Sequence, residues 1–185
     1  MQRESDAPWT RGGLRIKLAA LRALEGDARD RYLAGEEACG YVTGPASDAL
    51  LCDEAFPVAN CAGQLHLLDP KVFFRGPRSS FALNEKAFSG AVKRGSDAGR
   101  PVKVLYHSHL DASASFSVTD AAAMSRGDPP AYEGGPARLG PGPEWPLAFL
   151  VTSVCGGPSG PFVDDHRLYI WSGDRFEESS FRIVG

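Results

Sequence analysis

Two kinds of hydrophobic pattern alternate along this chain, one with the period of a helix and one with that of a strand. Leu14 to Lys17 fits a short edge strand, and the spacing of Leu21, Leu24 and Ala28 predicts a helix that continues to about Leu33. Because strand and helix patterns follow one another along the rest of the chain, we expect an α/β fold.

Four further segments have the character of strands. Val102 to His109 (VKVLYHSH) and the continuous apolar run from Leu147 to Val154 (LAFLVTSV) predict buried strands. Ala49 to Val58 predicts another strand, which Pro57 should end because proline cannot donate a hydrogen bond to a sheet. Phe81 to Leu83 is expected to pair with the same sheet.

A capped helix and a terminal hairpin complete the expected elements. Asn84 is a favourable N-cap residue, and Phe88 and Ala91 follow it at helical spacing. Arg167 to Trp171 and Arg175 to Phe181 lie on either side of a Ser-Gly-Asp turn, so this part of the chain predicts a hairpin.

Three stretches have neither pattern. Residues 1–13 are polar and are expected to form a flexible N-terminal tail, which leaves residues 14–185 as a single domain. Asn60 to Pro77 is expected to be irregular. Arg126 to Pro146 is dense in Gly and Pro, and a loop of this length in a compact domain is usually functional or disordered. We interpret it as an insertion that either covers a substrate or is merely tolerated.

Composition restricts the classes of function. The chain has 185 residues, of which 43% are hydrophobic, and this is enough for one domain with a substantial core. A net charge of −3 without a basic run argues against a nucleic-acid partner. No apolar stretch is long enough to span a membrane, and the N-terminal residues do not resemble a signal peptide. We therefore expect a soluble, cytoplasmic protein.

The cysteines and two of the histidines give no functional signal. His66 is expected to have a core or surface role, and His166 is expected to be solvated. The cysteines lack C-x-x-C spacing, so we expect reduced thiols outside the functional site. They are Cys39, Cys52, Cys61 and Cys155.

The clearest chemical signal comes from His107, His109 and Asp120. Side chains two apart on a strand project from one face, so both imidazoles should point the same way. Ser117 fits a helix N-cap with Asp120 in the first turn, from which the carboxylate can reach the end of the strand. Two imidazoles and one carboxylate suit zinc and leave the fourth tetrahedral position to a water molecule, as in catalytic sites. Zinc would lower the pKa of that water to about 7.

These residues also fit other interpretations, which are weaker. Ser117 and Asp120 alone could form no more than a capping box, and a His-x-His pair alone is a weak signal. Metallo-β-lactamase-like hydrolases need a histidine after the aspartate, but Ala112 follows Asp111 here. The amidohydrolase barrel needs about 250 residues. Zinc deaminases need a Pro-Cys-x-x-Cys motif, which the sequence lacks.

The spacing of His107, His109, Ser117 and Asp120 matches a known signature. The chain resembles the JAMM or MPN-plus metalloproteases, bacterial type, whose motif is His-x-His-Pro, six residues, Ser, two residues and Asp. Leu110 replaces the proline, which shapes the loop and ligates nothing. The resemblance implies a single cytidine-deaminase-like MPN domain, which is an α/β fold with a mixed sheet flanked by helices. It also implies one catalytic Zn²⁺ held by the two histidines and the aspartate.

The same family has a glutamate two residues before a Cys-Gly or similar pair that opens a strand. Glu37 matches this position, since Cys39 and Gly40 follow it. The resemblance implies that Glu37 takes a proton from the activated water and passes it to the leaving amine. Glu36 is the competing residue, because adjacent side chains on a strand point to opposite sides. Ser117 is implied to donate a hydrogen bond to the developing oxyanion.

Family members that keep these five polar residues are usually peptidases or isopeptidases that cut after the C-terminal Gly-Gly tail of ubiquitin or a ubiquitin-like protein. The resemblance therefore implies a zinc-dependent, deubiquitinase-like isopeptidase. Its partners would be a ubiquitin-like protein or its conjugates and E1-like or E2-like enzymes of the same pathway. Two alternatives remain open, namely hydrolysis of a sulfur-carrier protein and a non-catalytic MPN scaffold that binds protein partners.

Overall fold

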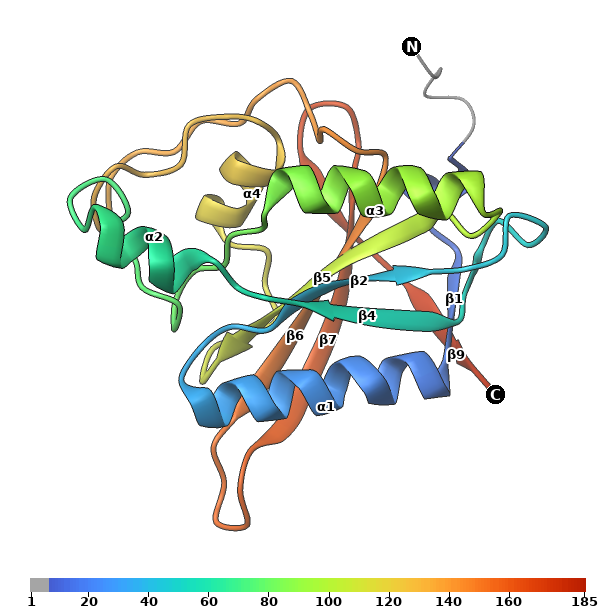
Figure 1. Ribbon diagram of the computed structural model, residues 1–185, viewed down its shortest axis with the longest axis horizontal. Coiled ribbons are helices and arrows are strands. Elements are labelled where there is room, and N and C mark those ends of the chain that lie inside the picture. Colours follow the sequence, from blue (N-terminus) through green and yellow to red (C-terminus); the bar gives the residue numbers. More distant parts are fainter. Residues whose placement is uncertain (1–6) are drawn as a thin grey trace.

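The computed structural model describes residues 7–185, which form a mixed sheet flanked by helices, as predicted (Figure 1). In this part of the chain the larger sheet consists of β2 (Cys39–Thr43), β4 (Glu54–Val58), β5 (Val102–Leu110), β6 (Ala148–Cys155), β7 (Phe162–Trp171) and β8 (Phe176–Ser179). The strands lie in the order β4-β2-β5-β6-β7-β8. β5 and β6 run parallel, and the other neighbouring pairs run antiparallel.

A smaller sheet lies beside the larger one. It contains the parallel strands β1 (Leu14–Lys17), β3 (Leu51–Cys52) and β9 (Phe181–Val184), in the order β3-β1-β9. The bounds predicted for β1 are confirmed, but its predicted position at a sheet edge is wrong. Its two partners come from distant parts of the chain, which a local pattern cannot reveal.

Helices cover both faces of the larger sheet (Figure 1). α1 (Leu18–Ala34) packs on one face, and α3 (Glu85–Asp97) and α4 (Val118–Met124) pack on the other. α1 ends at Gly35, whose φ of 74° is favourable only for glycine. The predicted cap of α3 is confirmed, because the Asn84 side chain accepts a hydrogen bond from Ala87 N at 3.0 Å.

Alternation along β5 determines which side chains face which helices. Val104 and Tyr106 belong to the core beneath α1, whereas Leu105 belongs to the core beneath α3. Because side chains alternate along a strand, His107 and His109 lie on the α3 side together with Leu105. The strand is buried along almost its whole length, as its apolar sequence predicts.

The segment predicted as one strand from Ala49 to Val58 is divided. β3 joins the smaller sheet, β4 joins the larger one, and Asp53 separates them. Pro57 does not end the strand but lies within β4, opposite Gly40. A proline is tolerated there because β4 is the outermost strand of its sheet.

The stretch from Asn60 to Pro77 is not wholly irregular, because it contains α2 (Ala62–Leu68). This helix buries little apart from Ala62, and Leu67 and Leu68 are exposed, so the sequence lacks a clear amphipathic pattern. Phe81 to Leu83 forms no strand, and Ala82 O instead accepts a hydrogen bond from Cys61 N at 2.9 Å.

The C-terminal hairpin is longer and ends differently from the prediction. β7 begins at Phe162 and pairs with both β6 and β8. Phe181 does not belong to the hairpin but begins β9, which crosses to the smaller sheet. The length of β7 follows from its pairing with β6, a buried strand that needs a partner along most of its length.

Part of the predicted N-terminal tail belongs to the folded structure. Pro8–Arg11 forms a 3-10 helix. The indole Nε1 of Trp9 donates to Pro146 O at 2.7 Å, and Trp9 packs against the core beneath α1. Residues 1–6 of the predicted tail lie outside the described residues.

The expectation of a solvated His166 is wrong. Its Nε2 lies 2.9 Å from Glu25 Oε1 on α1, and its Nδ1 lies 2.9 Å from Thr152 Oγ1 on β6. Only 13% of the His166 side chain is exposed. The histidine therefore joins α1 to the sheet, and it lies on the face opposite the one occupied by His107.

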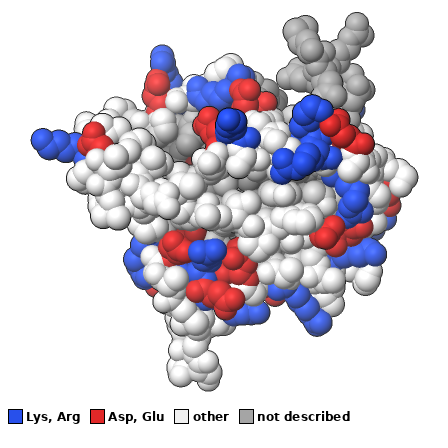
Figure 2. Space-filling view, in the orientation of Figure 1, with Lys and Arg blue, Asp and Glu red and all other residues white. Residues whose placement is uncertain are grey.

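The surface charges and the cysteines complete the description of the fold. On the face shown in Figure 2, basic and acidic side chains are interspersed around a band without charges. Among the described residues, no helix has the length and apolar character needed to cross a membrane.

All four cysteines are free, and Cys39 and Cys52 are buried. Burial raises the pKa of both thiols to about 12, so they are protonated at neutral pH.

Candidate metal centre

Three side chains from two elements meet on the α3 side of the larger sheet. β5 supplies His107 and His109, and the first turn of α4 supplies Asp120. The Nε2 atoms of the two histidines lie 3.2 Å apart, and each lies 3.4 Å from Asp120 Oδ2. The structure thus brings the three predicted ligands together, and this group could hold a metal ion.

The distances fit a tetrahedral metal site. Zinc with bonds of about 2.0–2.1 Å to its ligands keeps the ligand atoms about 3.3–3.4 Å apart. The observed separations of 3.2 and 3.4 Å match this spacing. In addition, His109 Nδ1 lies 2.8 Å from Ser113 O, so Nδ1 can donate to that carbonyl and leave the Nε2 lone pair for a metal ion.

The electrostatics of the group also favour a cation. Burial alone would raise the pKa of Asp120, but His107 and His109 hold it well below its ordinary value, so the carboxylate is ionised. Burial lowers the pKa of His109, whereas its hydrogen bond with Asp120 raises it, and the net shift is upward. Without a metal ion, the Nε2 atoms of the two imidazoles can lie this close only if a proton is between them. A cation bound by the three side chains would replace that proton.

Packing fixes the orientation of the first histidine. His107 is buried and stacks on Phe81, with ring centroids 4.4 Å apart and an interplanar angle of 21°. Phe81 therefore contributes to the site through its ring rather than through strand pairing. Phe116, from the loop before α4, lies on another side of the same imidazole, at 6.1 Å between centroids.

Ser117 and Asp120 form the predicted capping box. The Ser117 Oγ accepts from Asp120 N at 3.0 Å, and the Asp120 carboxylate accepts from Ser117 N at 3.1 Å. The Ser117 hydroxyl also donates to Asp120 Oδ2. Because a hydroxyl has one proton, Ser117 must rotate away from Asp120 before it can donate to a substrate oxygen. Its predicted oxyanion role stays a prediction.

Glu37 lies beside this group and is better placed than Glu36. The Glu37 side chain is buried, and its Oε2 has no hydrogen-bond partner in the described part of the chain. Burial raises the pKa of Glu37 to about 8, His109 and Arg75 oppose this shift, and Asp120 adds to it. Glu36 instead pairs with Arg31 at the end of α1. Geometry thus favours Glu37 over its neighbour.

Glu37 is not part of β2, which begins two residues later, so its position depends on its backbone partners. Glu37 N donates to Pro77 O at 2.7 Å, and Asn60 Nδ2 donates to Glu37 O at 3.0 Å. Asn60 also donates to Ser80 O and accepts from Ala62 N and Ala82 N. The amide of Asn60 therefore connects Glu37 to the whole segment from α2 to residue 82.

The serine between the two histidines fixes the other side of the same backbone. Ala38 N donates to Ser108 Oγ at 2.8 Å, and Ser108 N donates to Ala38 O at 2.9 Å. These two bonds set the register between β5 and the residue that follows Glu37. Sequence patterns alone identified neither Ser108 nor Asn60. The presence of a serine within an apolar strand could have indicated a role for Ser108. No local feature of the sequence indicated a role for Asn60.

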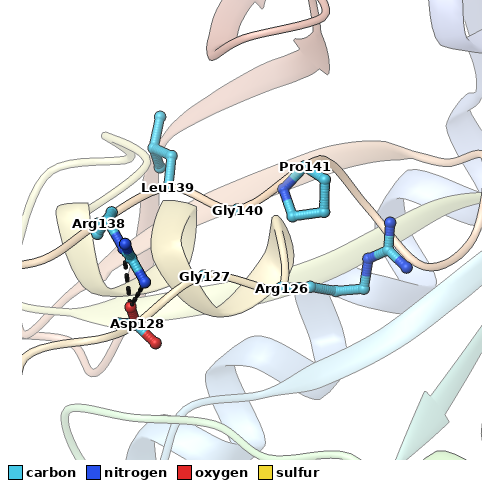
Figure 3. Close-up of a pocket in the computed structure, with 7 residues that line it drawn as sticks. All are labelled: Arg126, Gly127, Asp128, Arg138, Leu139, Gly140 and Pro141. Carbon is cyan, nitrogen blue, oxygen red and sulfur yellow. Dashed lines mark hydrogen bonds and ion pairs between the residues drawn. The ribbon is translucent and has the colours of Figure 1, made fainter.

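The insertion at residues 126–146 is ordered and anchored near its base. Gly140 N donates to the buried Ser125 Oγ at 3.0 Å, and Gly142 N donates to Ser125 O at 3.1 Å. Asp128 and Arg138 pair through both backbone and side chains beside a surface hollow (Figure 3). From this base the insertion extends over α4 toward the segment that follows α2 (Figure 1).

The sequence between residues 19 and 154 matches the family of prokaryotic homologs of the JAB domain. This region contains Glu37, Ser108 and all three candidate ligands. The chain belongs to this family, and the resemblance to JAMM and MPN proteins is confirmed. The JAB/MPN family includes metal-dependent isopeptidases. Among curated proteins, none matches the sequence significantly.

Two solved structures with TM-scores above 0.5 show the same fold. A protein from Desulfitobacterium hafniense has a TM-score of 0.53 and 18% identity, with 92% of each chain covered. A protein from Salinibacter ruber has a TM-score of 0.53 and 17% identity over the same share of both chains. A JAB1/MPN domain protein from Archaeoglobus fulgidus has a TM-score of 0.47 and 14% identity, and the comparison covers 93% of this chain and 98% of that chain.

Proposed function

We propose that this protein is a zinc-dependent isopeptidase or peptidase that hydrolyses the amide bond after the C-terminal tail of a ubiquitin-like protein. One observation carries the proposal. A buried carboxylate, Glu37, with an oxygen that has no partner within residues 7–185 lies beside three side chains whose ligand atoms have tetrahedral spacing. A purely structural role would leave both the buried oxygen and the facing imidazoles without a purpose.

Each residue of the site has a chemical task in this proposal. When bound, zinc would lower the pKa of a water molecule to about 7 and polarise the amide carbonyl. In its ionised form, which a cation bound beside it would favour, Glu37 accepts the water proton at Oε2, which has no other partner among the described residues, and then transfers it to the departing amine. His107, His109 and Asp120 hold the metal ion.

Ser117 would stabilise the negative charge that develops on the substrate carbonyl. Its hydroxyl turns from Asp120 Oδ2 to the oxyanion, while its backbone N–H keeps the cap hydrogen bond to Asp120. Removal of one oxyanion donor typically reduces the rate by about two to three orders of magnitude.

A glycine tail suits the surroundings of the site. Glycine lets the backbone approach closely and leaves no side chain to clash in a narrow cleft. The segment from α2 to residue 82 is joined to Glu37 through Asn60, and the insertion at 126–146 reaches the same side of the molecule. We infer that the two segments flank the tail while the body of the ubiquitin-like protein or of its conjugate docks outside, and that E1-like or E2-like enzymes of the same pathway are further partners.

Cleavage of a ubiquitin-like protein with a C-terminal fusion tests the proposal. Zinc-loaded protein should release the fusion partner, and Glu37→Gln should reduce turnover by about 10²–10⁴ while zinc content and melting temperature stay the same. Glu36→Gln is the matched control, because Glu36 pairs with Arg31, and it should keep its activity. A Glu37→Gln protein as active as the parent would remove Glu37 from the mechanism.

The identity of the tail gives a second test. Replacing the penultimate glycine of the tail by a bulky residue should abolish cleavage, whereas changing the group beyond the scissile bond should matter less. Equal cleavage of both tails would favour a general metallopeptidase or a hydrolase of sulfur-carrier proteins. A zinc-loaded protein that binds but cleaves no fusion would favour a non-catalytic scaffold.

A further inference from the structure

Arg75 links three parts of the molecule that meet at the candidate metal centre. It lies between α2 and Pro77, the residue whose carbonyl accepts the hydrogen bond from Glu37 N. It is close enough to Glu37 to lower the pKa of that carboxylate. Its Nη2 also lies 3.3 Å from Glu133 Oε2, near the tip of the insertion. No role in the mechanism above uses this guanidinium.

The hydrogen-bond capacity of Arg75 is not used fully. Its Nε is buried and has no hydrogen-bond partner in the described part of the chain. Leaving a buried donor without an acceptor is unfavourable, and more so for a charged group. Because this Nε is buried, an acceptor that arrives with the substrate can reach it only if the Arg75 side chain moves, as it would on leaving Glu133.

The contact with Glu133 is the kind that a ligand can displace. The Glu133 side chain is 81% exposed, whereas that of Arg75 is 23% exposed. Ion pairs in which a partner is this exposed contribute little to stability. The carboxylate of Glu133 therefore contacts a partly buried arginine from the solvent side.

We propose that the Arg75 guanidinium binds a main-chain carbonyl of the extended substrate tail, and that Glu133 occupies the same guanidinium in the free protein. This inference rests on the proposed function and identifies a specificity residue for it. Arginine is suited to the task because it is always charged and presents several N–H donors in a fixed plane. It cannot give up a proton, so its contribution is to binding rather than to proton transfer.

The proposal predicts that replacing Arg75 and replacing Glu133 change KM in opposite directions. Arg75→Met should raise KM for the tail fusion about 10- to 100-fold with a smaller effect on kcat, as expected for loss of a charge-assisted hydrogen bond. Glu133→Gln should lower KM by up to about fivefold, because the competing carboxylate is removed. If the pair served only to stabilise the fold, both variants would weaken the protein in the same direction.

A charge-preserving variant and two controls make the test specific. Arg75→Lys keeps a positive charge beside Glu37 but loses the Nε donor, so KM should stay raised. Lys71→Met removes an exposed charge from the same segment, and Glu144→Gln alters another exposed ion pair of the insertion. Both controls should keep the KM of the parent, and all variants should keep its zinc content and melting temperature.

Measurements of peptide affinity test this inference independently of the proposed function. A fluorescent peptide with the extended tail and two C-terminal glycines should bind the zinc-loaded parent more tightly than Arg75→Lys, and Glu133→Gln should bind it at least as tightly as the parent. Equal affinities of parent and Arg75→Lys, or weaker binding by Glu133→Gln, would overturn the inference even if the parent cleaves fusions. If the parent cleaves none, the proposed function fails, and peptide affinities still decide the role of Arg75.

Discussion

At the scale of single residues, one oxygen atom, Asp120 Oδ2, is the common neighbour of the other polar groups of the site. Asp120 Oδ2 accepts from Ser117 N and Ser117 Oγ and lies 3.4 Å from both His107 Nε2 and His109 Nε2. Four neighbours around one carboxylate oxygen orient it and lower its basicity. The same arrangement pre-positions the oxygen as a metal ligand, because little reorganisation is then needed when an ion binds.

Loss of one ligand should abolish metal binding. We expect about one zinc per parent chain, and His109→Ala should lose both zinc and activity, since two remaining ligands cannot form a closed site. His66→Ala is the matched control, because His66 bonds to Phe73 O and lies outside the ligand group. Elemental analysis of protein prepared without chelator measures the difference, and a parent that takes up no zinc on titration would contradict the site.

Glu37 should make the stability of the metal-free protein depend on pH. Its pKa in the folded state is raised to about 8 by burial, above its ordinary value of 4.5, so the folded state binds the proton more tightly than the unfolded state. Its contribution is therefore fully present below about pH 4.5 and is lost as the pH rises through about 8.

Urea unfolding of the metal-free protein at pH 6 and pH 9 measures this effect. The free energy of unfolding should fall less between the two values in Glu37→Gln than in the parent, because glutamine does not ionise. Glu36→Gln should follow the parent. Equal pH dependence in all three proteins would show that Glu37 is not held protonated.

At the scale of elements, a short helix has two tasks. α4 has only seven residues, and its capping box both starts the helix and holds the ligand carboxylate. α3 has a comparable cap in Asn84 but no ligand in its first turn. The two helices therefore allow the effect of losing a cap to be separated from the effect on the metal.

Removal of the two caps should have distinguishable consequences. Ser117→Ala and Asn84→Ala should each lower the free energy of unfolding by about 1 kcal/mol, the usual effect of losing an N-cap. Only Ser117→Ala should also weaken zinc affinity, because the Asp120 carboxylate then loses one of the two hydrogen bonds from Ser117 that orient it. Competition with a zinc chelator measures the affinity. An equal loss of zinc affinity in both variants would contradict the proposed role of the capping box.

At the scale of the whole molecule, a buried lysine connects separate layers. Lys103 on β5 is fully buried, and its Nζ donates to the carbonyl oxygens of Pro45, Asp48 and Leu51 at 2.8–3.0 Å. Burial lowers its pKa, and the three carbonyls replace its lost hydration. Trp9 lies over the same ammonium group at 5.7 Å. Lys103 thus joins the larger sheet, the connection from β2 to β3, and the N-terminal segment.

Replacing this lysine should destabilise the fold without touching the metal centre. Lys103→Met should lower the free energy of unfolding by about 2–4 kcal/mol, because three carbonyls lose their donor. Lys93→Met, which alters an exposed ion pair with Asp97 on α3, should change it by less than about 0.5 kcal/mol. Urea unfolding distinguishes the two. Zinc content should be normal in both, and a stable Lys103→Met protein would contradict the assigned role.

Features that depend on short spacing could be predicted from the sequence. His107 and His109 share a face because of the two-residue period of a strand, and Asp120 turns back because of the first turn of a capped helix. These relations hold within a few residues. For the same reason β1, β5, β6 and the start of α3 were predicted close to their observed bounds.

Contacts between distant segments could not be predicted from the sequence and are seen only in the folded domain. The central position of β1, the crossing of β9, the hydrogen bonds of Asn60 to Glu37, and the ion pair of Arg75 with Glu133 all join residues far apart in the chain. Their contact energies depend on the packing of the complete domain, and no local period encodes that packing. The burial of Lys103 belongs to the same class, because its three acceptors come together only when the layers assemble.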